Sequence, residues 1–260
     1  MIPRRTLLAA GLAMPLLPAA AASGRNALET FLRMRCSPEG QSTYWSYSGH
    51  MLARVEGEPL RPLLSIIGAS RSHIRRQPDG AIIYSLVEAG YYGAPDAAAS
   101  PAGAIADSPI TNALTGSPIT PEHYLSPQTL RFTPDMQVMP DMGPLPPGVE
   151  YRGRITPPDI KQGRVWMAEE LFVKLPGNPS KILNSLANFE TSLKDLDRRA
   201  SFVPCSMQYT TLNSFRPWMN MGAAKGEIMM RLNAIKLARW DNVPAALRQR
   251  IEADHGDKLK

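Results

Sequence analysis

The stretch YWSYSGHMLARVE, residues 44–56, decides the class of fold. Its odd-numbered positions are mainly apolar, and they are Trp45, Tyr47, Gly49, Met51, Ala53 and Val55. The residues between them are mostly polar. Because successive side chains of a β-strand point to opposite faces, this alternation predicts a strand with one apolar face and one mostly polar face. Such a strand needs neighbours that share its apolar face.

Short segments of a similar kind, separated by turn residues, occupy most of the chain on either side of this strand. We expect them at residues 63–68, 70–76, 81–92, 128–133, 149–155, 164–174, 188–193, 201–215 and 227–237. Segment 81–92 is apolar on both faces and should lie deep in the sheet. Helices are expected only at residues 26–35 and 243–253, with a helical turn at 181–186.

About ten short strands without regular alternation with helices predict a mainly β protein. We expect a single antiparallel β-barrel of the calycin or lipocalin type with a short N-terminal and a C-terminal helix, and a β-sandwich is the alternative. The 25 prolines argue against a helical bundle, because an internal proline removes a backbone donor and clashes with the preceding turn. Residues 93–120, rich in Ala, Pro, Ser and Gly, indicate a long surface loop. A barrel of this size is able to hold a small ligand.

Residues 1–22 have the parts of a cleavable export signal: the pair Arg4-Arg5, a short apolar centre and the small-residue run Ala19–Ala22. Adjacent arginines favour the twin-arginine route. We therefore expect a periplasmic or secreted protein that meets the twin-arginine export machinery during transport, with a single domain at residues 23–260. No stretch reaches the roughly 20 apolar residues of a bilayer crossing, so no stable membrane span is expected.

The formal net charge of +6 is spread along the chain rather than gathered in one run. The densest basic group is Arg71, Arg75 and Arg76, which is too small for the basic stripe that nucleic-acid binding needs. We therefore expect no nucleic-acid partner. Cys36 and Cys205 are the only cysteines, and two interpretations stay open: one disulfide in an oxidising compartment, or two buried thiols.

Several short motifs resemble those of one protein family. They are Tyr47-Ser48-Gly49, Thr115-Gly116, His123-Tyr124-Leu125-Ser126, Asp195-Leu196-Asp197, Val203-Pro204, Arg216-Pro217-Trp218-Met219, Met221-Gly222, Gly226 and Lys236-Leu237. As a set they resemble the exported bacterial family DUF1838, over roughly residues 40–240. The resemblance implies a shared fold and an exported setting, and it implies no activity.

Glu88 is the acid with the strongest claim to chemistry, because it shares a predicted strand face with Ile82, Tyr84 and Leu86. A carboxylate among apolar side chains loses hydration, as a general acid or base does. The alternative is a structural ion pair with Arg75 or Arg76 on the neighbouring strand. In the catalytic interpretation those arginines stabilise developing negative charge, and His123, at the end of the long loop, is the counterpart of Glu88.

Glu169 and Glu170 interrupt another apolar strand, and one of these neighbours must point inward. The pattern does not say which. Aromatic residues on or beside the predicted strands suit a pocket that stacks an apolar ligand, although they suit an ordinary core equally. The candidate substrate-binding residues are Trp45, Tyr47, Tyr84, Trp166, Glu169, Glu170, Tyr209 and Trp218.

No nucleotide, nicotinamide or flavin motif is present, so no cofactor is expected. The four histidines lack the spacing of a zinc or iron site. One metal alternative is Met136, Met139 and Met142, whose thioethers suit Cu(I). Met also fills cores and lines adaptable pockets, and this interpretation is favoured, so no metal site is expected.

The sequence thus predicts an exported barrel that receives a small, largely apolar or aromatic molecule. We expect cofactor-independent acid/base chemistry on that molecule, as isomerisation, elimination, cyclisation or hydrolysis. The main alternative is a non-catalytic carrier or sensor with the same pocket. A methionine-based copper protein and a structural envelope protein are further alternatives.

Overall fold

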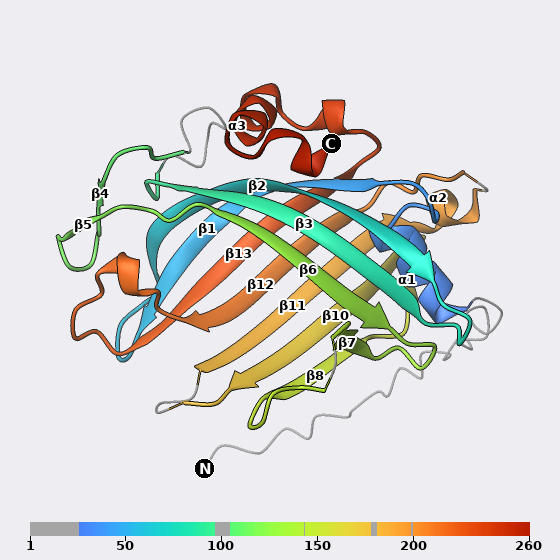
Figure 1. Ribbon diagram of the computed structural model, residues 1–260, viewed down its shortest axis with the longest axis horizontal. Coiled ribbons are helices and arrows are strands. Elements are labelled where there is room, and N and C mark those ends of the chain that lie inside the picture. Colours follow the sequence, from blue (N-terminus) through green and yellow to red (C-terminus); the bar gives the residue numbers. More distant parts are fainter. Residues whose placement is uncertain (1–25, 97–104, 143, 178–180, 199) are drawn as a thin grey trace, which may run out of the picture.

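The computed structural model describes residues 26–96, 105–142, 144–177, 181–198 and 200–260. Its main feature is one large antiparallel sheet (Figure 1). The strands are β1 (Thr43–Val55), β2 (Arg61–Arg76), β3 (Ile82–Gly93), β6 (Tyr124–Phe132), β7 (Val138–Pro140), β8 (Glu150–Ile155), β9 (Asp159–Lys161), β10 (Arg164–Leu175), β11 (Lys181–Ser192), β12 (Ser206–Ser214) and β13 (Gly226–Leu237). The helices are α1 (Ala27–Arg35), α2 (Leu193–Asp197) and α3 (Ala245–His255), with the 3-10 turns η2 (Pro217–Met219), η3 (Trp240–Asn242) and η4 (Gly256–Leu259).

The sheet curls into a nearly closed barrel with the strand order β7-β6-β3-β2-β1-β13-β12-β11-β10-β8, and β9 pairs with β10. Its two edges meet where Gln137 bridges to Arg154 and the Ile155 N–H donates to the Met136 carbonyl at 2.8 Å. Closure of the barrel pairs backbone N–H and C=O groups that would otherwise be exposed on the edge strands. The barrel predicted from the sequence is therefore confirmed, and the sandwich alternative is wrong.

The alternation in residues 44–56 appears as predicted, because Trp45, Tyr47 and Met51 on β1 are buried inside the barrel. Helix α1 plugs one end of the interior. Its Phe31 ring packs edge-on against Phe132 and Phe189, with ring centroids 5.6 and 5.4 Å away. The opposite end carries the small hairpin of β4 (Ile110–Thr111) and β5 (Pro118–Ile119), at the left of Figure 1.

A second apolar cluster lies outside the barrel, where α3 covers β2 and β3 (Figure 1). Leu247 and Ile251 of the helix pack with Ala69, Ala89 and Tyr91 of the sheet. Segment 81–92 is apolar on both faces for this reason: one face lines the interior and the other lies beneath a helix. The C-terminal helix predicted at 243–253 begins two residues later.

Other details differ from the sequence-based predictions. Residues 181–186 are the first half of strand β11, not a helical turn, because β10 pairs with all of them and β12 pairs with residues 184–186. Within segment 93–120, the β4–β5 hairpin forms. The predicted signal at residues 1–22 lies outside the described residues.

Of the two interpretations of the cysteines, the structure supports buried thiols and not a disulfide, because Cys36 and Cys205 are both free and buried. Burial raises the pKa of each thiol to about 12. Neither thiol is therefore activated as a nucleophile. Within the described part of the chain, no helix is long and apolar enough to cross a membrane.

Candidate active site

The barrel interior contains a cavity of about 520 Å³ between the α1 plug and the β4–β5 end. The volume matches that of pockets for small organic molecules. Inward-facing side chains from eight strands contribute to its wall. Those predicted as site residues are Trp45, Tyr47, Tyr84, Glu88, His123, Glu169, Tyr209 and Trp218.

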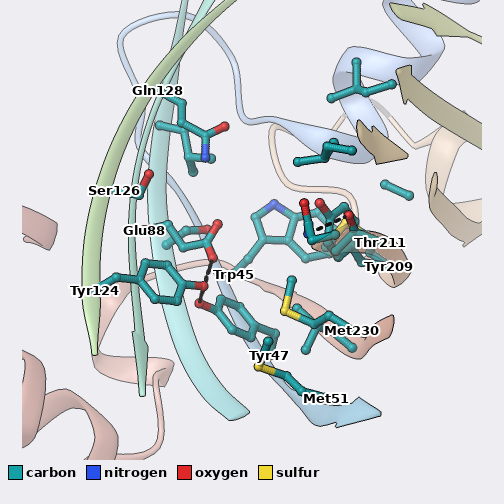
Figure 2. Close-up of a pocket in the computed structure, with 18 of the residues that line it drawn as sticks. Trp45, Tyr47, Met51, Glu88, Tyr124, Ser126, Gln128, Tyr209, Thr211 and Met230 are labelled. Atoms are coloured by element: carbon teal, nitrogen blue, oxygen red, sulfur yellow. Dashed lines mark hydrogen bonds between the residues drawn. The ribbon is translucent and has the colours of Figure 1, made fainter. Parts of the chain in front are cut away.

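Glu88 lies in this cavity and is held by two tyrosines. The Tyr124 hydroxyl donates to Glu88 Oε1 at 2.5 Å, and the Tyr47 hydroxyl lies 2.8 Å from the same oxygen (Figure 2). The two hydroxyl oxygens are 3.1 Å apart. No donor in the described part of the chain reaches Oε2. The protein thus fixes one carboxylate oxygen, and the other has no protein donor among the described residues.

The tyrosine rings reach Glu88 because two glycines lie beneath them. Tyr47, Gly68, Gly90 and Tyr124 are register partners in one row across β1, β2, β3 and β6. A Cβ at Gly68 would lie 2.2 Å from Tyr47 Cζ, and one at Gly90 would lie 2.3 Å from Tyr124 Cζ. Only glycine lets each ring lie flat on the neighbouring strand, with its hydroxyl directed at Glu88, two residues from Gly90 along β3.

Both tyrosines remain protonated over the ordinary pH range. Burial, and then the negative charge of Glu88, raise the pKa of Tyr47 and of Tyr124 well above the usual value. A phenol O–H that accompanies a carboxylate is a donor and not a base. The arrangement stabilises negative charge at one position and keeps two O–H donors beside it.

His123 lines the same cavity, near its open end, but its imidazole is held by the backbone. Nδ1 accepts the Tyr92 N–H at 3.2 Å, and a further hydrogen bond joins the ring to the backbone of Ala106. Burial, followed by the positive charge of Arg250, lowers the pKa of His123. The ring is therefore neutral at pH 7, and no hydrogen bond joins it to Glu88.

The inward acid of the pair on β10 is Glu169. It is buried and accepts from Arg35 Nη1 at 2.6 Å. Burial raises the pKa of Glu169, and the Arg35 cation opposes that rise. The guanidinium carbon of Arg35 also lies 4.6 Å from the centroid of the Tyr84 ring and 5.3 Å from that of Phe189. This ion pair closes the cavity at the α1 end.

The cavity has two chemically different walls. Figure 2 shows Glu88, Tyr124, Ser126 and Gln128 on one side and Met51, Tyr209, Thr211 and Met230 on the other. Met51 and Met230 are direct register partners on β1 and β13. Thioethers are flexible and make favourable contacts with aromatic rings. This side of the cavity is therefore apolar and adaptable, and the Glu88 side is polar.

Four predicted site residues lie elsewhere. Arg75 and Arg76 are exposed near the end of β2, and Arg76 pairs with Glu29 at 2.6 Å. Ser70, not either arginine, is the β2 register partner of Glu88. The ion pair with Glu88 that formed the structural alternative is therefore wrong, and so is a role for these arginines at the carboxylate.

Trp166 and Glu170 share the outward parity of β10, opposite to Glu169. Glu170 pairs with Arg154 at 2.6 Å on the outer surface. Neither residue contributes to the cavity wall. Their assignment to substrate binding is therefore wrong. The sequence showed which residues share a face of the strand, but it did not show which face points into the barrel.

The sequence analysis missed several residues of this site. Tyr124 appeared only as part of a family motif, and Arg35 only as the last residue of a helix. Gly68 and Gly90 were not singled out. The register of the strands brings them together, and the one local clue was a glycine within an otherwise apolar strand, which marks close approach of another group.

No cluster of three or more His, Cys, Asp or Glu side chains able to hold a metal occurs in the described ranges. Met139 and Met142 of the copper alternative are exposed. Met136 packs against the barrel core instead of joining them in the cavity. The three thioethers thus do not line one pocket.

Fold and site together define a class: an antiparallel β-barrel whose interior cavity contains a carboxylate fixed by two tyrosines. Residues 169–256 match the family described as "Protein of unknown function (DUF1838)". This match runs from within β10 to Gly256 and confirms the resemblance for the motifs between Asp195 and Leu237, while the motifs before residue 169 lie outside it. A comparison with curated proteins finds no match.

Proposed function

We propose that this protein binds a small, largely apolar or aromatic molecule in the barrel and transforms it by acid/base chemistry without a cofactor. One observation carries the proposal. Glu88 faces a cavity of suitable volume with one oxygen fixed by two phenol donors and the other free of protein donors. General bases need this combination of access and fixed geometry.

The chemistry that this arrangement supports best is proton abstraction beside a carbonyl or phenol oxygen. Glu88 Oε2 takes the proton, the C–H or O–H bond breaks, and its electron pair moves onto the ligand as an enolate or phenolate. Protonation cancels the charge that held the two tyrosine hydroxyls. These hydroxyls then donate to the new oxyanion, as preorganised donors do elsewhere. Return of the proton to another atom of the same ligand gives isomerisation. If the ligand has a leaving group beside the enolate, its bond breaks as the enolate electrons form a double bond, Glu88 returns the proton to that group, and the result is elimination.

In this mechanism Tyr124 takes the place that the sequence suggested for His123. Its hydroxyl is 2.5 Å from Glu88 Oε1, whereas both hydrogen bonds of the imidazole go to the backbone. His123 then shapes the open end of the cavity beside Tyr92. The catalytic pair of this proposal is Glu88 with Tyr124, assisted by Tyr47.

The test is a Glu88→Gln variant, which keeps the shape and removes the base. With a substrate found by screening enolisable aromatic ketones and phenols, we expect kcat to fall by roughly 10²–10⁴-fold while binding persists. The matched control is Glu170→Gln on the outer surface. Equal turnover by wild type and Glu88→Gln would end the proposal.

A carrier or sensor is the second candidate, favoured by the methionines Met51 and Met230 in the wall, since such side chains adapt to varied ligands. Two results together would favour this candidate. The protein binds the ligand without converting it, and it does not catalyse exchange of the ligand's acidic hydrogens with heavy water.

We also propose export, from the basic pair and apolar segment in residues 1–22. The support is the sequence pattern alone. Replacing Arg4 and Arg5 by lysine should retain the precursor in the cytoplasm if the twin-arginine route is used. Cleavage and secretion of that variant at the wild-type level would remove this part of the proposal.

A further inference from the structure

The open end of the cavity carries a cation without a partner. Arg216 is an exposed residue that precedes η2 and lines the cavity, and its guanidinium has no ion-pair or hydrogen-bond partner among the described residues. Trp218 of the same turn contacts Tyr92, with ring centroids 5.4 Å apart. These residues belong to the motif Arg216-Pro217-Trp218-Met219, which the mechanism above does not use.

The turn that presents Arg216 is fixed by the β4–β5 hairpin. Asn112, fully buried, donates from Nδ2 to the Met219 carbonyl at 2.7 Å. Asn220 donates from Nδ2 to the Pro118 carbonyl at 2.7 Å, and the Thr115 hydroxyl donates to the Asn220 carbonyl at 3.1 Å. Two segments about 100 residues apart in the sequence thus hold one arginine at the mouth.

Among the charged groups on the cavity wall, Arg216 is the one best placed to bind an anion. At the far end, Arg35 and Glu169 neutralise each other. Midway, the two tyrosines hold Glu88. The remaining groups, Glu122 and His123, lie at the mouth with Arg216, and the imidazole is neutral.

The effect of Arg216 reaches the cavity wall. Burial raises the pKa of Tyr92 to about 12, the positive charge of Arg216 opposes this rise, and Glu88 adds to it. Tyr92 is therefore close enough to interact electrostatically with both Arg216 at the mouth and Glu88 further in. Tyr92 and Glu88 are four residues apart on one face of β3, which corresponds to about 13 Å.

We propose that the ligand is an elongated organic acid, with its carboxylate at Arg216 and its apolar body running inward to Glu88. The inference rests on the proposed function, since it assigns the substrate class of the same cavity. The carboxylate stays at the mouth, where Arg216 pairs with it and Glu88 is distant. The end that loses a proton lies inside, between Glu88 and the methionine wall.

The experiment compares two ligands of equal shape, ω-phenylhexanoic acid and its amide, by titration calorimetry at low ionic strength. We expect the acid to bind wild type about three- to tenfold more tightly than the amide, as for a partly exposed ion pair. Arg216→Gln should remove this preference. Arg75→Gln, at an exposed arginine outside the cavity, should leave it intact.

Two further measurements sharpen the test. Glu122→Gln should increase the preference for the acid, because the competing negative charge at the mouth is removed. About 0.5 M salt should reduce the preference in wild type, since the screening length there is only a few ångströms.

The outcomes separate this inference from the proposed function. Equal binding of acid and amide by wild type, or an acid preference that survives Arg216→Gln, overturns the assignment of an organic acid and leaves the cavity as a binding site. Failure of both ligands to bind even at millimolar concentration counts against the proposed pocket itself, and the assignment falls with it.

Discussion

The position that a Cβ would take at Gly90 is occupied by the phenol ring of Tyr124, whose Cε1 and Cζ atoms lie 2.3 Å from it. An alanine at this position must displace the ring and with it the hydroxyl that holds Glu88. We predict that Gly90→Ala lowers the free energy of unfolding by about 1–3 kcal/mol, the usual cost of overpacking. Activity on the screened substrate should fall as well. Urea unfolding and steady-state kinetics measure the two effects.

The matching control combines Gly90→Ala with Tyr124→Ala. If the ring is the cause, alanine at residue 90 should cost little stability once the ring is absent, so the two changes should not be additive. An equal cost in both backgrounds would show that the backbone, and not Tyr124, requires glycine.

The two tyrosines should contribute unequally to turnover. Tyr124→Phe removes the donor with the 2.5 Å hydrogen bond, and Tyr47→Phe removes the one at 2.8 Å, whose hydroxyl also donates to the Ala89 carbonyl at 3.0 Å. We predict a loss in kcat of roughly 10²-fold for Tyr124→Phe and a smaller loss for Tyr47→Phe. Kinetics of both variants check this order. Full activity of the double variant would contradict a role for these donors in the reaction.

The barrel was predictable because its signal is local. The alternation in residues 44–56 and the doubly apolar segment 81–92 report a buried face directly, and closure follows when many short strands share one inner face. Glu88 was found in the same way, as an acid among apolar side chains. The pattern could not supply the partner of Glu88, since the register between β3 and β6 decides that Tyr124 reaches it.

The positions of the charged residues were also beyond what the sequence pattern could predict. Glu169 and Glu170 are neighbours with the same chemistry, and only the inward parity of β10 separates a buried acid from a surface one. Arg75 and Arg76 appeared close to Glu88 because β2 and β3 were expected to pair. The observed register instead places Arg75 opposite Ile83, five residues from Glu88 along β3.

The same pair of neighbours offers a matched test of burial. We predict that Glu169→Gln lowers the free energy of unfolding by about 3–5 kcal/mol, because it leaves the buried Arg35 cation without a counter-charge. Glu170→Gln should cost at most about 1 kcal/mol, since its partner Arg154 is exposed. Urea unfolding at pH 7 compares the two. Similar losses in both variants would show that the Arg35 charge finds compensation elsewhere in the barrel.

Lys236 should give the protein a stability that depends on pH. Its Nζ is buried beneath α1, where it donates to the carbonyls of Arg33 and Cys36. Burial lowers the pKa of Lys236 to about 8. In the unfolded chain the amine stays protonated to higher pH, so between these values the unfolded state binds more protons, and raising the pH favours the folded state.

We therefore predict that wild type gains about 1–2 kcal/mol of unfolding free energy relative to Lys236→Met between pH 7 and 9.5. The comparison with a variant cancels the titration of the buried thiols, which is common to both proteins. Lys161→Met, at an exposed lysine, controls for the loss of one positive charge. Parallel pH profiles for wild type and Lys236→Met would mean that the buried amine keeps its proton, held there by the two carbonyls.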